Sequence, residues 1–239
     1  MVDAVVYDRG WPRIAEAAFD NTRRLIPGRY DDHDESPLAA LSDNDKDLRT
    51  LMQLSAATDS RLQAQAERHP AGLGRDDLVF GIPYSRIINA AFAYPGDGGR
   101  FHSPNSKGAW YCALDLETCV AEVVHKRVNH LAECGLNAES NISYRLFLAD
   151  IHGQKFAWLD QDSSVDRACL DPFSHTSGQA LGEQLTADHT SGIVYPSVRN
   201  PGGTCIAVLA APVVANVRRA ARYTFTIENG ALVDLSYCR

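Results

Sequence analysis

The sequence predicts an α+β protein in which a mixed β-sheet with flanking helices follows a helical N-terminal extension. After residue 75, short runs rich in apolar, β-branched and aromatic residues alternate with a few helical stretches. The N-terminal part lacks such runs and instead carries apolar residues at helical spacing. A length of 239 residues suits one domain with an addition. The expected division is therefore a helical extension over 1–75 and a sheet domain over 76–239.

The N-terminal extension is expected to contain two helices separated by an acidic stretch. The first is predicted over 12–27, because Pro12 suits a first helical position and Gly28 follows the stripe as a stop signal. The second is predicted over 42–70, where apolar residues recur at helical spacing. Seven acids and one base lie within 31–47, which favours an exposed loop or an interaction surface. The extension would cover the sheet or contact a partner protein.

Seven runs in the second part have the composition of strands, and two stretches have that of helices. The strands are expected at residues 78–84, 109–114, 142–149, 155–159, 192–197, 204–210 and 222–227. The stronger helix is expected to be capped by Asp115, and its apolar stripe consists of Val120, Val123, Val124, Val128 and Leu131. A second helix is expected over 179–188. In the run 142–149, alternation places Ile142, Tyr144, Leu146 and Leu148 on one face.

Composition and charge exclude several classes of protein. With 45% hydrophobic and 22% charged residues, the chain is neither disordered nor fibrous. Its longest apolar run, 205–215, is too short to span a bilayer and is interrupted by Pro212. A net charge of −7 argues against direct contact with nucleic acid or an anionic membrane. The N-terminus has acidic residues where a secretory signal has basic ones, so a cytoplasmic location is expected.

Several familiar motifs are absent. The six cysteines include no CxxC pair, which argues against a zinc or disulfide framework, so we expect no metal and mostly core thiols. The stretch PGDGGRFHSPNSKG has Phe101 where a dinucleotide fingerprint needs its third glycine, and it lacks the GK[ST] of a phosphate loop. There is no GxSxG elbow, and His125 and His130 are spaced unfavourably for one zinc site. Serine-hydrolase and zinc-hydrolase functions are therefore disfavoured.

The polar residues that remain form an ordered set. Arg100 follows two glycines, and Tyr111 lies in the strand predicted after it. Glu122 lies in the first turns of the next predicted helix, and Ser197 lies at a later strand end, beside a turn rich in Pro and Gly. Sites are usually built at strand ends and turns of this kind.

These segments resemble the RES domain family. The block GGRFHSPNSKGAWYCALDLETCVAEVVHKRV, followed by SGIVYPSVRNPGG, is similar to its motif, in which an Arg, a Glu and a Ser occur in that order. The matching residues are Arg100, Glu122 and Ser197, and the family's tyrosine falls on Tyr111. An earlier family arginine is matched to Arg86 in PYSRI. The resemblance covers roughly 78–215, with Phe101 in place of the usual tryptophan.

The resemblance implies a toxin of a RES–Xre toxin–antitoxin pair, with an ADP-ribosyltransferase-like sheet core. Such proteins consume NAD+ by cleaving the bond between nicotinamide and ribose, and transfer ADP-ribose to phosphate, water or a protein. The implied partner is an Xre-type antitoxin with a helix-turn-helix domain. The sequence leaves open whether the chain forms a homodimer or a toxin–antitoxin hetero-oligomer.

The residue types suit this chemistry. Cleaving an N-glycosidic bond builds positive charge on the ribose, and the carboxylate of Glu122 would stabilise that charge. Arg100, with Arg86, would bind the pyrophosphate, and the bare backbone of Gly99 would approach it. Tyr111 would stack on nicotinamide, and Ser197 would hold a ribose hydroxyl or the nicotinamide amide.

Each residue also has a structural alternative. Glu122 precedes Lys126 by four positions, the spacing of an ordinary helical ion pair. Tyr111 can be a core residue of its strand, and Ser197 a turn former. Two further functions stay open: a mono-ADP-ribosyltransferase that modifies a host metabolic enzyme, and a binding module without catalytic activity that docks through its acidic segment and helices.

Overall fold

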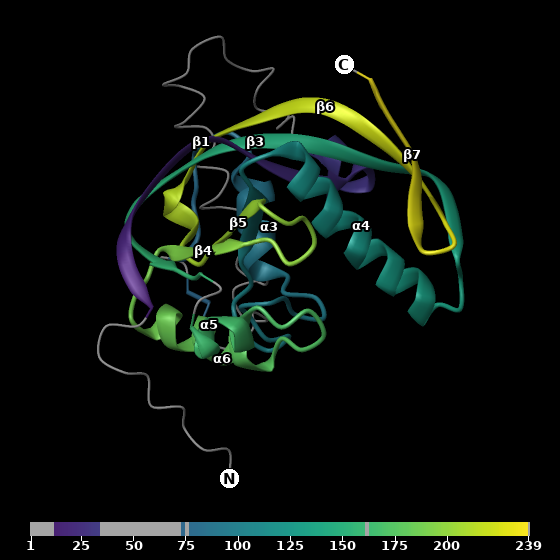
Figure 1. Cartoon of the computed structure of the whole chain (residues 1–239). Coiled ribbons are helices and arrows are strands. Elements are labelled where there is room, and N and C mark those ends of the chain that lie inside the picture. The colour runs from purple at the N-terminus through teal and green to yellow at the C-terminus, as the bar shows by residue number, and fades with distance from the viewer. Residues whose placement is uncertain (1–11, 34–72, 75–76, 161–162, 239) are drawn as a thin grey trace.

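The computed structural model of the chain describes residues 12–33, 73–74, 77–160 and 163–238, and shows a seven-stranded mixed sheet flanked by helices (Figure 1). The strands are β1 Arg13–Pro27, β2 Trp110–Ala113, β3 Ala138–Trp158, β4 Gly192–Pro196, β5 Thr204–Val208, β6 Val214–Glu228 and β7 Ala231–Cys238. The helices are α3 Ser85–Ala93, α4 Leu116–Glu133, α5 Ser164–Cys169 and α6 Thr176–Ala187, with 3-10 turns at Gly28–His33 and Ala211–Val213. The α+β prediction is confirmed.

The sheet has the strand order β1-β2-β5-β4-β3-β6-β7, and β1 also pairs with β3. Among the strands of the described residues, β3 and β4 run parallel and every other pairing is antiparallel. Because β1 contacts both β2 and β3, the strands β1, β2, β5, β4 and β3 close on themselves. The hairpin of β6 and β7 extends from this closed part beside the C-terminal end of α4 (Figure 1).

The helix predicted over 12–27 is wrong, because these residues form strand β1. The strand pairs with β3 from Arg13↔Trp158 to Pro27↔Tyr144, with irregular register around Asn21, whose φ is +55°. Ala17 is buried in this pairing at 2% exposure. Long-range pairing has overridden the local helical pattern, as it often does for weakly amphipathic segments. The helix predicted over 42–70 and most of the acidic stretch 31–47 lie outside the described residues.

The strand predicted over 78–84 is also absent. The segment forms bends and turns, and both backbone groups of Val79 bond to one side chain: its N–H donates to Asn89 Oδ1 at 2.9 Å, and its C=O accepts from Asn89 Nδ2 at 2.8 Å. Positive φ at Gly81 (+70°) and Tyr84 (+59°) then turns the chain into α3, which the sequence reasoning did not anticipate.

The remaining strands follow the sequence more closely. The predicted runs at 109–114, 192–197 and 204–210 appear as β2, β4 and β5. The runs at 142–149 and 155–159 belong to one continuous strand, β3, and 222–227 is the C-terminal half of β6. Helix α5 and strand β7 were not predicted. The division at residue 75 stays a prediction, although β1 shows that residues before it belong to the sheet.

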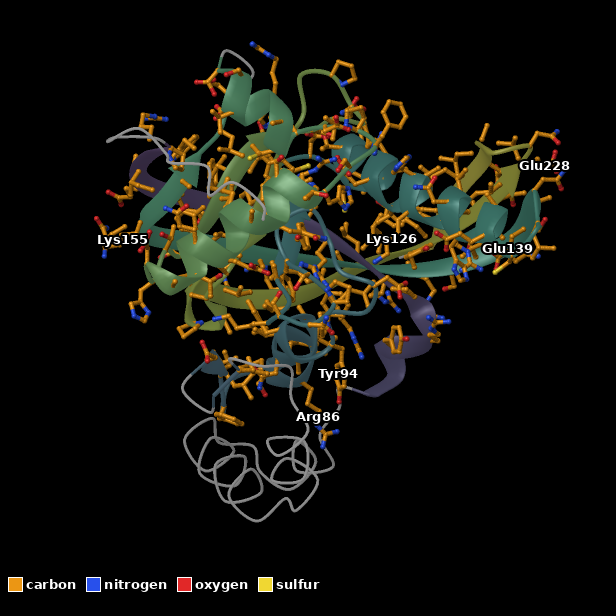
Figure 2. The ribbon with its side chains drawn as sticks, turned by 90° about the horizontal axis from the view of Figure 1, so that it is seen from below. Arg86, Tyr94, Lys126, Glu139, Lys155 and Glu228 are labelled. Carbon is orange, nitrogen blue, oxygen red and sulfur yellow. The ribbon has the colours of Figure 1, made fainter. Side chains whose placement is uncertain are left out.

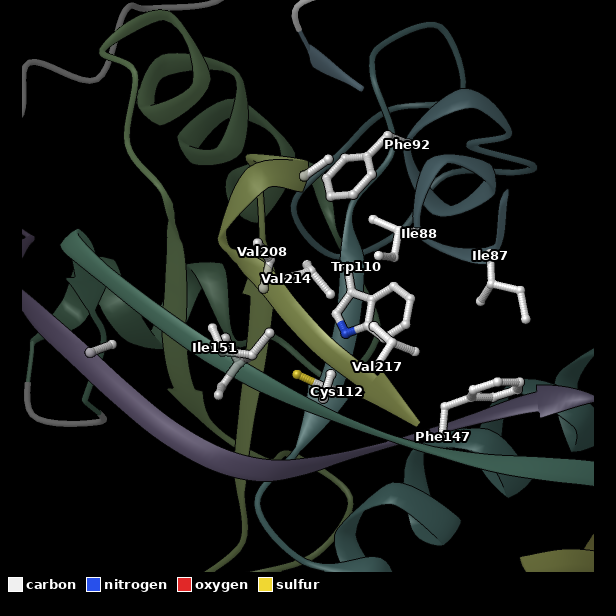
Figure 3. Close-up of a cluster of buried hydrophobic side chains, with 14 of the residues drawn as sticks. Ile87, Ile88, Phe92, Trp110, Cys112, Phe147, Ile151, Val208, Val214 and Val217 are labelled. Carbon is white, nitrogen blue, oxygen red and sulfur yellow. The ribbon is translucent and has the colours of Figure 1, made fainter. Parts of the chain in front are cut away.

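The two faces of β2, β5 and β4 bury different clusters. On one face Trp110, Ile206 and Val208 pack against Ile88 and Phe92 of α3, all at 0% exposure (Figure 3). On the other face, α5 and α6 pack against the sheet and contribute to a second apolar cluster. Its members are Phe101, Ala109, Ala157, Leu159, Cys169, Leu170, Leu181, Leu185, Ile193, Tyr195, Cys205, Ala207 and Leu209. Alternating side-chain direction along each strand produces this separation.

Helix α4 begins as the sequence predicts. The Asp115 carboxylate accepts hydrogen bonds from Thr118 N at 2.7 Å and from Thr118 Oγ1 at 2.8 Å, which caps the helix. Its apolar side packs on a third cluster that includes Leu146 and Phe225. The predicted face of Ile142, Tyr144, Leu146 and Leu148 lies in that cluster. The capped first turns are thereby fixed against the ends of β2 and β5.

Two findings concern the described residues as a whole. None of their helices is long and apolar enough to cross a membrane. Cys112, Cys119, Cys169 and Cys205 are buried free thiols, as the sequence predicts for core cysteines, and Cys134 is an exposed one.

Candidate functional site

Glu122 and Ser197, 75 residues apart in the chain, are in direct contact. Ser197 Oγ donates a hydrogen bond to Glu122 Oε1 at 2.7 Å, and the Cys205 thiol lies 3.7 Å from the same oxygen. Ser197 is buried at 4% exposure, immediately after the end of β4. The hydroxyl therefore fixes one carboxylate oxygen, while Oε2 takes part in neither contact.

The turn after β4 holds Ser197 in this position. Its Oγ accepts hydrogen bonds from Arg199 N at 3.1 Å and Asn200 N at 3.0 Å, so all hydrogen-bonding capacity of the hydroxyl is used. Asn200 Nδ2 in turn donates to Thr118 Oγ1 at 2.8 Å, which joins the turn to the cap of α4. The turn and α4 are thus joined by two side-chain hydrogen bonds, one of which is the bond from Ser197 to Glu122.

Arg100 lies buried between the glycine loop and the segment that links α5 to α6. Its NH1 group donates to Cys169 O at 3.1 Å and to Asp171 O at 2.8 Å, and the residue is 7% exposed. Helix α6 approaches the Arg100 backbone closely because it has glycine at two positions one turn apart. A Cβ would lie 2.4 Å from Arg100 O at Gly178, and 1.9 Å from Phe101 O at Gly182.

Tyr111 anchors the loop that carries Arg100. Its hydroxyl accepts a hydrogen bond from Phe101 N and lies next to His102 Nδ1, both at 3.0 Å. His102 Nε2 lies 3.2 Å from Pro95 O, which can only accept, so Nε2 carries the proton and Nδ1 accepts from the tyrosine. Burial raises the pKa of Tyr111 and lowers that of His102, which keeps both groups neutral.

Basic side chains lie near the carboxylate of Glu122. Arg199 belongs to the same turn as Ser197 and donates through NH2 to Pro172 O. His125 lies three residues after Glu122 on α4, and His175 is the N-cap residue of α6. The charges of Arg100 and Arg199 both act on these two histidines. The chain is acidic overall, but this region is cationic.

The pKa directions follow from that arrangement. Burial, followed by the charge of Arg199, lowers the pKa of His125, although Glu122 acts in the opposite direction. Burial and then Arg100 lower the pKa of His175. Burial raises the pKa of Cys205, and the negative charge of Glu122 raises it further. The site therefore holds neutral histidines, an unreactive thiol and permanently charged guanidinium groups.

A surface pocket of about 370 Å³ adjoins the site but is not its centre. It opens between the glycine loop and α6, and its lining includes Phe101, His102, Lys107 and Glu183. Arg100, Glu122 and Ser197 are not part of that lining. In the described part of the chain, no three His, Cys, Asp or Glu side chains lie close enough to hold a metal ion.

The structure brings together most of the residues that the sequence selected, with Arg86 as the exception. Glu122 touches Ser197, and Tyr111 on β2 anchors the loop that carries Gly99 and Arg100. Glu122 and Arg100 both act electrostatically on Tyr195 and Arg199. Gly99 is tightly enclosed, since a Cβ there would lie 2.6 Å from His102 Cε1.

Arg86 is exposed on α3, which packs on the opposite face of the sheet. Figure 2 shows it beside Tyr94, away from Lys126 of α4. Its assignment to NAD+ therefore receives no support from the geometry. The Tyr111 hydroxyl is committed to the loop, so stacking of its ring on nicotinamide stays a prediction, as does direct contact between Ser197 and a ligand.

The sequence reasoning missed three basic side chains, one arginine and two histidines. Arg199 lies in the motif segment YPSVRNPGG, and His125 in AEVVH, so proximity to Ser197 and Glu122 was an available signal for both. His175 lies between α5 and the predicted helix, in a segment without a recognisable pattern. Only the packing of α6 against the glycine loop places it near Arg100.

The family comparison agrees with the sequence motif. The family model described as RES domain matches residues 78–228, which is more than half of the chain. No curated protein matches the sequence. One solved structure to which the chain is similar is described as "Crystal structure of the M.tuberculosis MbcT-MbcA toxin-antitoxin complex", with 14% identity, coverage of 87% of this chain and 86% of that chain, and a TM-score of 0.44.

Proposed function

The chain belongs to the RES domain family, and from that premise we propose that it is an NAD+-consuming toxin that cleaves the bond between nicotinamide and ribose. The observation that carries the proposal is the Ser197–Glu122 hydrogen bond of 2.7 Å beside a set of arginines. It supports a fixed carboxylate at one end of the site and anion-binding groups at the other. NAD+ presents a cationic ring and a pyrophosphate in the same relation.

Glu122 supplies the electrostatic part of the reaction. When the bond breaks, its electron pair leaves with neutral nicotinamide, and positive charge develops on the ribose. A carboxylate held in place by a hydrogen bond stabilises that charge without reorganising. The acceptor then bonds to the same ribose carbon and loses a proton. Phosphate gives a phosphorylated ADP-ribose, water gives ADP-ribose, and a protein side chain gives an ADP-ribosylated protein.

Arg100 and Arg199 supply the binding part. Each guanidinium uses only some of its five donors on the backbone carbonyls described above, so further N–H groups can reach phosphate oxygens. Helix α6 begins beside Arg100 and has no acidic residue in its first turn. The side chain of its N-cap residue, His175, makes no capping hydrogen bond. Its N-terminal N–H groups add to the attraction for an anion.

The proposal includes a helix-turn-helix antitoxin as the partner that blocks this site, as the family resemblance implies. Transfer to a specific metabolic enzyme is the alternative within the same chemistry, and the residues described here do not distinguish acceptors. A binding module without catalysis is disfavoured because the buried Ser197–Glu122 pair and its cationic surroundings are features of a site, and an exposed docking surface needs none of them.

The test is incubation of purified, folded, antitoxin-free chain with NAD+, with and without inorganic phosphate, followed by separation of the nucleotides. We expect NAD+ to disappear and nicotinamide to accumulate. A phosphorylated product that forms only with phosphate identifies phosphate as the acceptor, and labelled protein from tagged NAD+ in a lysate identifies a protein acceptor. NAD+ that stays intact under every condition contradicts the proposal.

A further inference from the structure

Phe173 is the most exposed large apolar side chain in the described part of the chain. It is 96% exposed, and the next value, at Tyr237, is 61%. It lies in the short segment Leu170–His175 that links α5 to α6. A phenylalanine ring that stands free in water gains no free energy of burial from folding, so packing within the chain does not account for an aromatic residue here. Single exposed apolar side chains are common on protein surfaces, so the argument depends on what surrounds this one.

The segment around Phe173 is held in a defined conformation. The Asp171 carboxylate oxygen Oδ1 accepts hydrogen bonds from Phe173 N at 2.7 Å and from Ser174 N at 2.9 Å. These two bonds also lower the pKa of Asp171, which keeps its carboxylate ionised. The ring therefore projects from a closed turn, and its exposure is a property of that turn.

The same segment is anchored by the two arginines of the candidate site. Arg100 NH1 donates to Asp171 O at 2.8 Å, and Arg199 NH2 donates to Pro172 O. The residues on the N-terminal side of Phe173 are thus attached to both guanidinium groups that we assign to the pyrophosphate. His175, two residues later, lies in the field of the same two arginines.

We propose that Phe173 contacts the substrate directly and stacks on one of the two flat rings of the bound dinucleotide. The inference rests on the proposed function, because it requires a dinucleotide whose phosphates lie at Arg100 and Arg199. An adenine ring or a nicotinamide ring lies at either side of such a pyrophosphate, within reach of a neighbouring side chain. Stacking covers the Phe173 ring, and aromatic side chains stack on such bases with little dependence on the base.

Substitutions at Phe173 give the most direct test. We expect Phe173→Ala to weaken binding of NAD+ about tenfold, seen as a raised KM with little change in kcat, because the ring would contact ground state and transition state alike. Phe173→Leu keeps an apolar side chain but no ring and should behave like the alanine variant, whereas Phe173→Tyr should bind like the parent. Tyr237→Ala, which removes an exposed aromatic ring from β7, is the matched control and should change nothing.

Ligand fragments identify the ring that is stacked. ADP-ribose retains adenine, and nicotinamide mononucleotide retains nicotinamide; calorimetry measures both affinities for the parent and Phe173→Ala chains. A tenfold loss with ADP-ribose alone places Phe173 on adenine, and a loss with the mononucleotide alone places it on nicotinamide. Affinities within twofold of the parent for NAD+ and both fragments overturn the inference.

The two proposals fail in different ways. If the parent consumes NAD+ and Phe173→Ala does so with an unchanged KM, the inference about Phe173 is wrong and the proposed function stands. If the parent neither binds nor consumes NAD+, both are wrong. Because Phe173 is exposed, its substitution should leave the thermal unfolding curve unchanged, and circular dichroism confirms that each variant is folded.

Discussion

The strands β2, β5 and β4 carry an apolar cluster on one face and the candidate functional site at the edge of the other. On the first face, Trp110 and Ile206 are completely buried under α3. On the second face, the neighbouring residues Tyr111 and Cys205 contact the glycine loop and Glu122. Consecutive residues of the same strands thus face the α3 core on one side and the candidate site on the other, and a register shift of one residue would exchange the two environments.

The difference between the faces shows what positions the site. Both faces bury apolar clusters, but on the site face directed hydrogen bonds also hold the polar residues: Ser197 to Glu122, Asn200 to Thr118, and Phe101 to Tyr111. Substitutions of the apolar residues under α3 and of the polar residues of the site should therefore have different effects on the protein. Those on the α3 face should lower stability, and those on the site face should lower activity in a chain that still folds.

The largest effect is expected on the α3 face. Trp110→Ala removes a completely buried indole and should lower the free energy of unfolding by about 3–5 kcal/mol. Arg24, whose guanidinium lies 4.6 Å from the Trp110 ring centroid, would lose its stacking partner as well. Urea denaturation measures the change. A loss below about 1 kcal/mol would mean that this face is not the main core.

Glu122→Gln should have the largest effect on activity. The amide keeps the size of the side chain but removes the charge that stabilises the developing ribose cation, so NAD+ turnover should fall about 10²- to 10³-fold. The unfolding curve should stay close to that of the parent. Glu133→Gln, at the exposed end of the same helix, is the control and should retain full turnover. Equal turnover in both variants would remove Glu122 from the mechanism.

Ser197→Ala should have a smaller effect, which appears both in the free energy of unfolding and in NAD+ turnover. It leaves Arg199 N and Asn200 N without their acceptor and releases Glu122 Oε1, so we expect about 1–2 kcal/mol less stability and about tenfold slower turnover. Ser197→Thr, which keeps the hydroxyl, should recover part of both. Turnover equal to that of the parent in the alanine variant would show that the Ser197 bond does not position Glu122.

The smallest expected effect is a pH dependence of ligand affinity. In the free chain the pKa values of His125 and His175 lie below their usual range, so both are neutral near pH 7. A bound pyrophosphate favours their protonated forms, so binding takes up protons and tightens as pH falls. ADP-ribose should bind about two- to fivefold more tightly at pH 6 than at pH 7.5, as calorimetry can measure.

Two variants assign this pH effect. His175→Asn and His125→Asn should each reduce the difference in affinity between pH 6 and pH 7.5. Without ligand the sign is opposite: histidines with lowered pKa values bind fewer protons in the folded chain than in the unfolded chain, so stability falls as pH drops below about 6.5. Weaker ADP-ribose binding at pH 6 than at pH 7.5 would show that the histidines do not face the anion.

The sequence predicted which polar residues lie together better than it predicted the N-terminal part of the fold, because Glu122 and Ser197 are in contact. Their roles in catalysis stay predictions. Arg100, Glu122 and Ser197 were identifiable because each lies in a distinctive local motif. The order of these motifs along the chain does not depend on the conformation of the loops between them. The cap at Asp115 and the alternation in β3 were local signals too, and both are confirmed. Local chemistry was in these cases sufficient.

Features that depend on long-range pairing could not be predicted in this way. Residues 13–27 carry a weak helical stripe, and only their partner strand β3, more than 100 residues later, makes them a strand. The run 78–84 has the composition of a strand but bonds to Asn89 on α3. Arg86 was selected by its place in the chain, and the side of the sheet on which α3 packs removes it from the site.

A crystal structure of the Glu122→Gln chain with intact NAD+ tests the central claim most directly. We expect the nicotinamide ribose to lie beside residue 122 and Ser197, and the pyrophosphate to lie between Arg100, Arg199 and the N-terminus of α6. A dinucleotide bound on the α3 face beside Arg86, or one whose ribose lies away from residue 122, would contradict it.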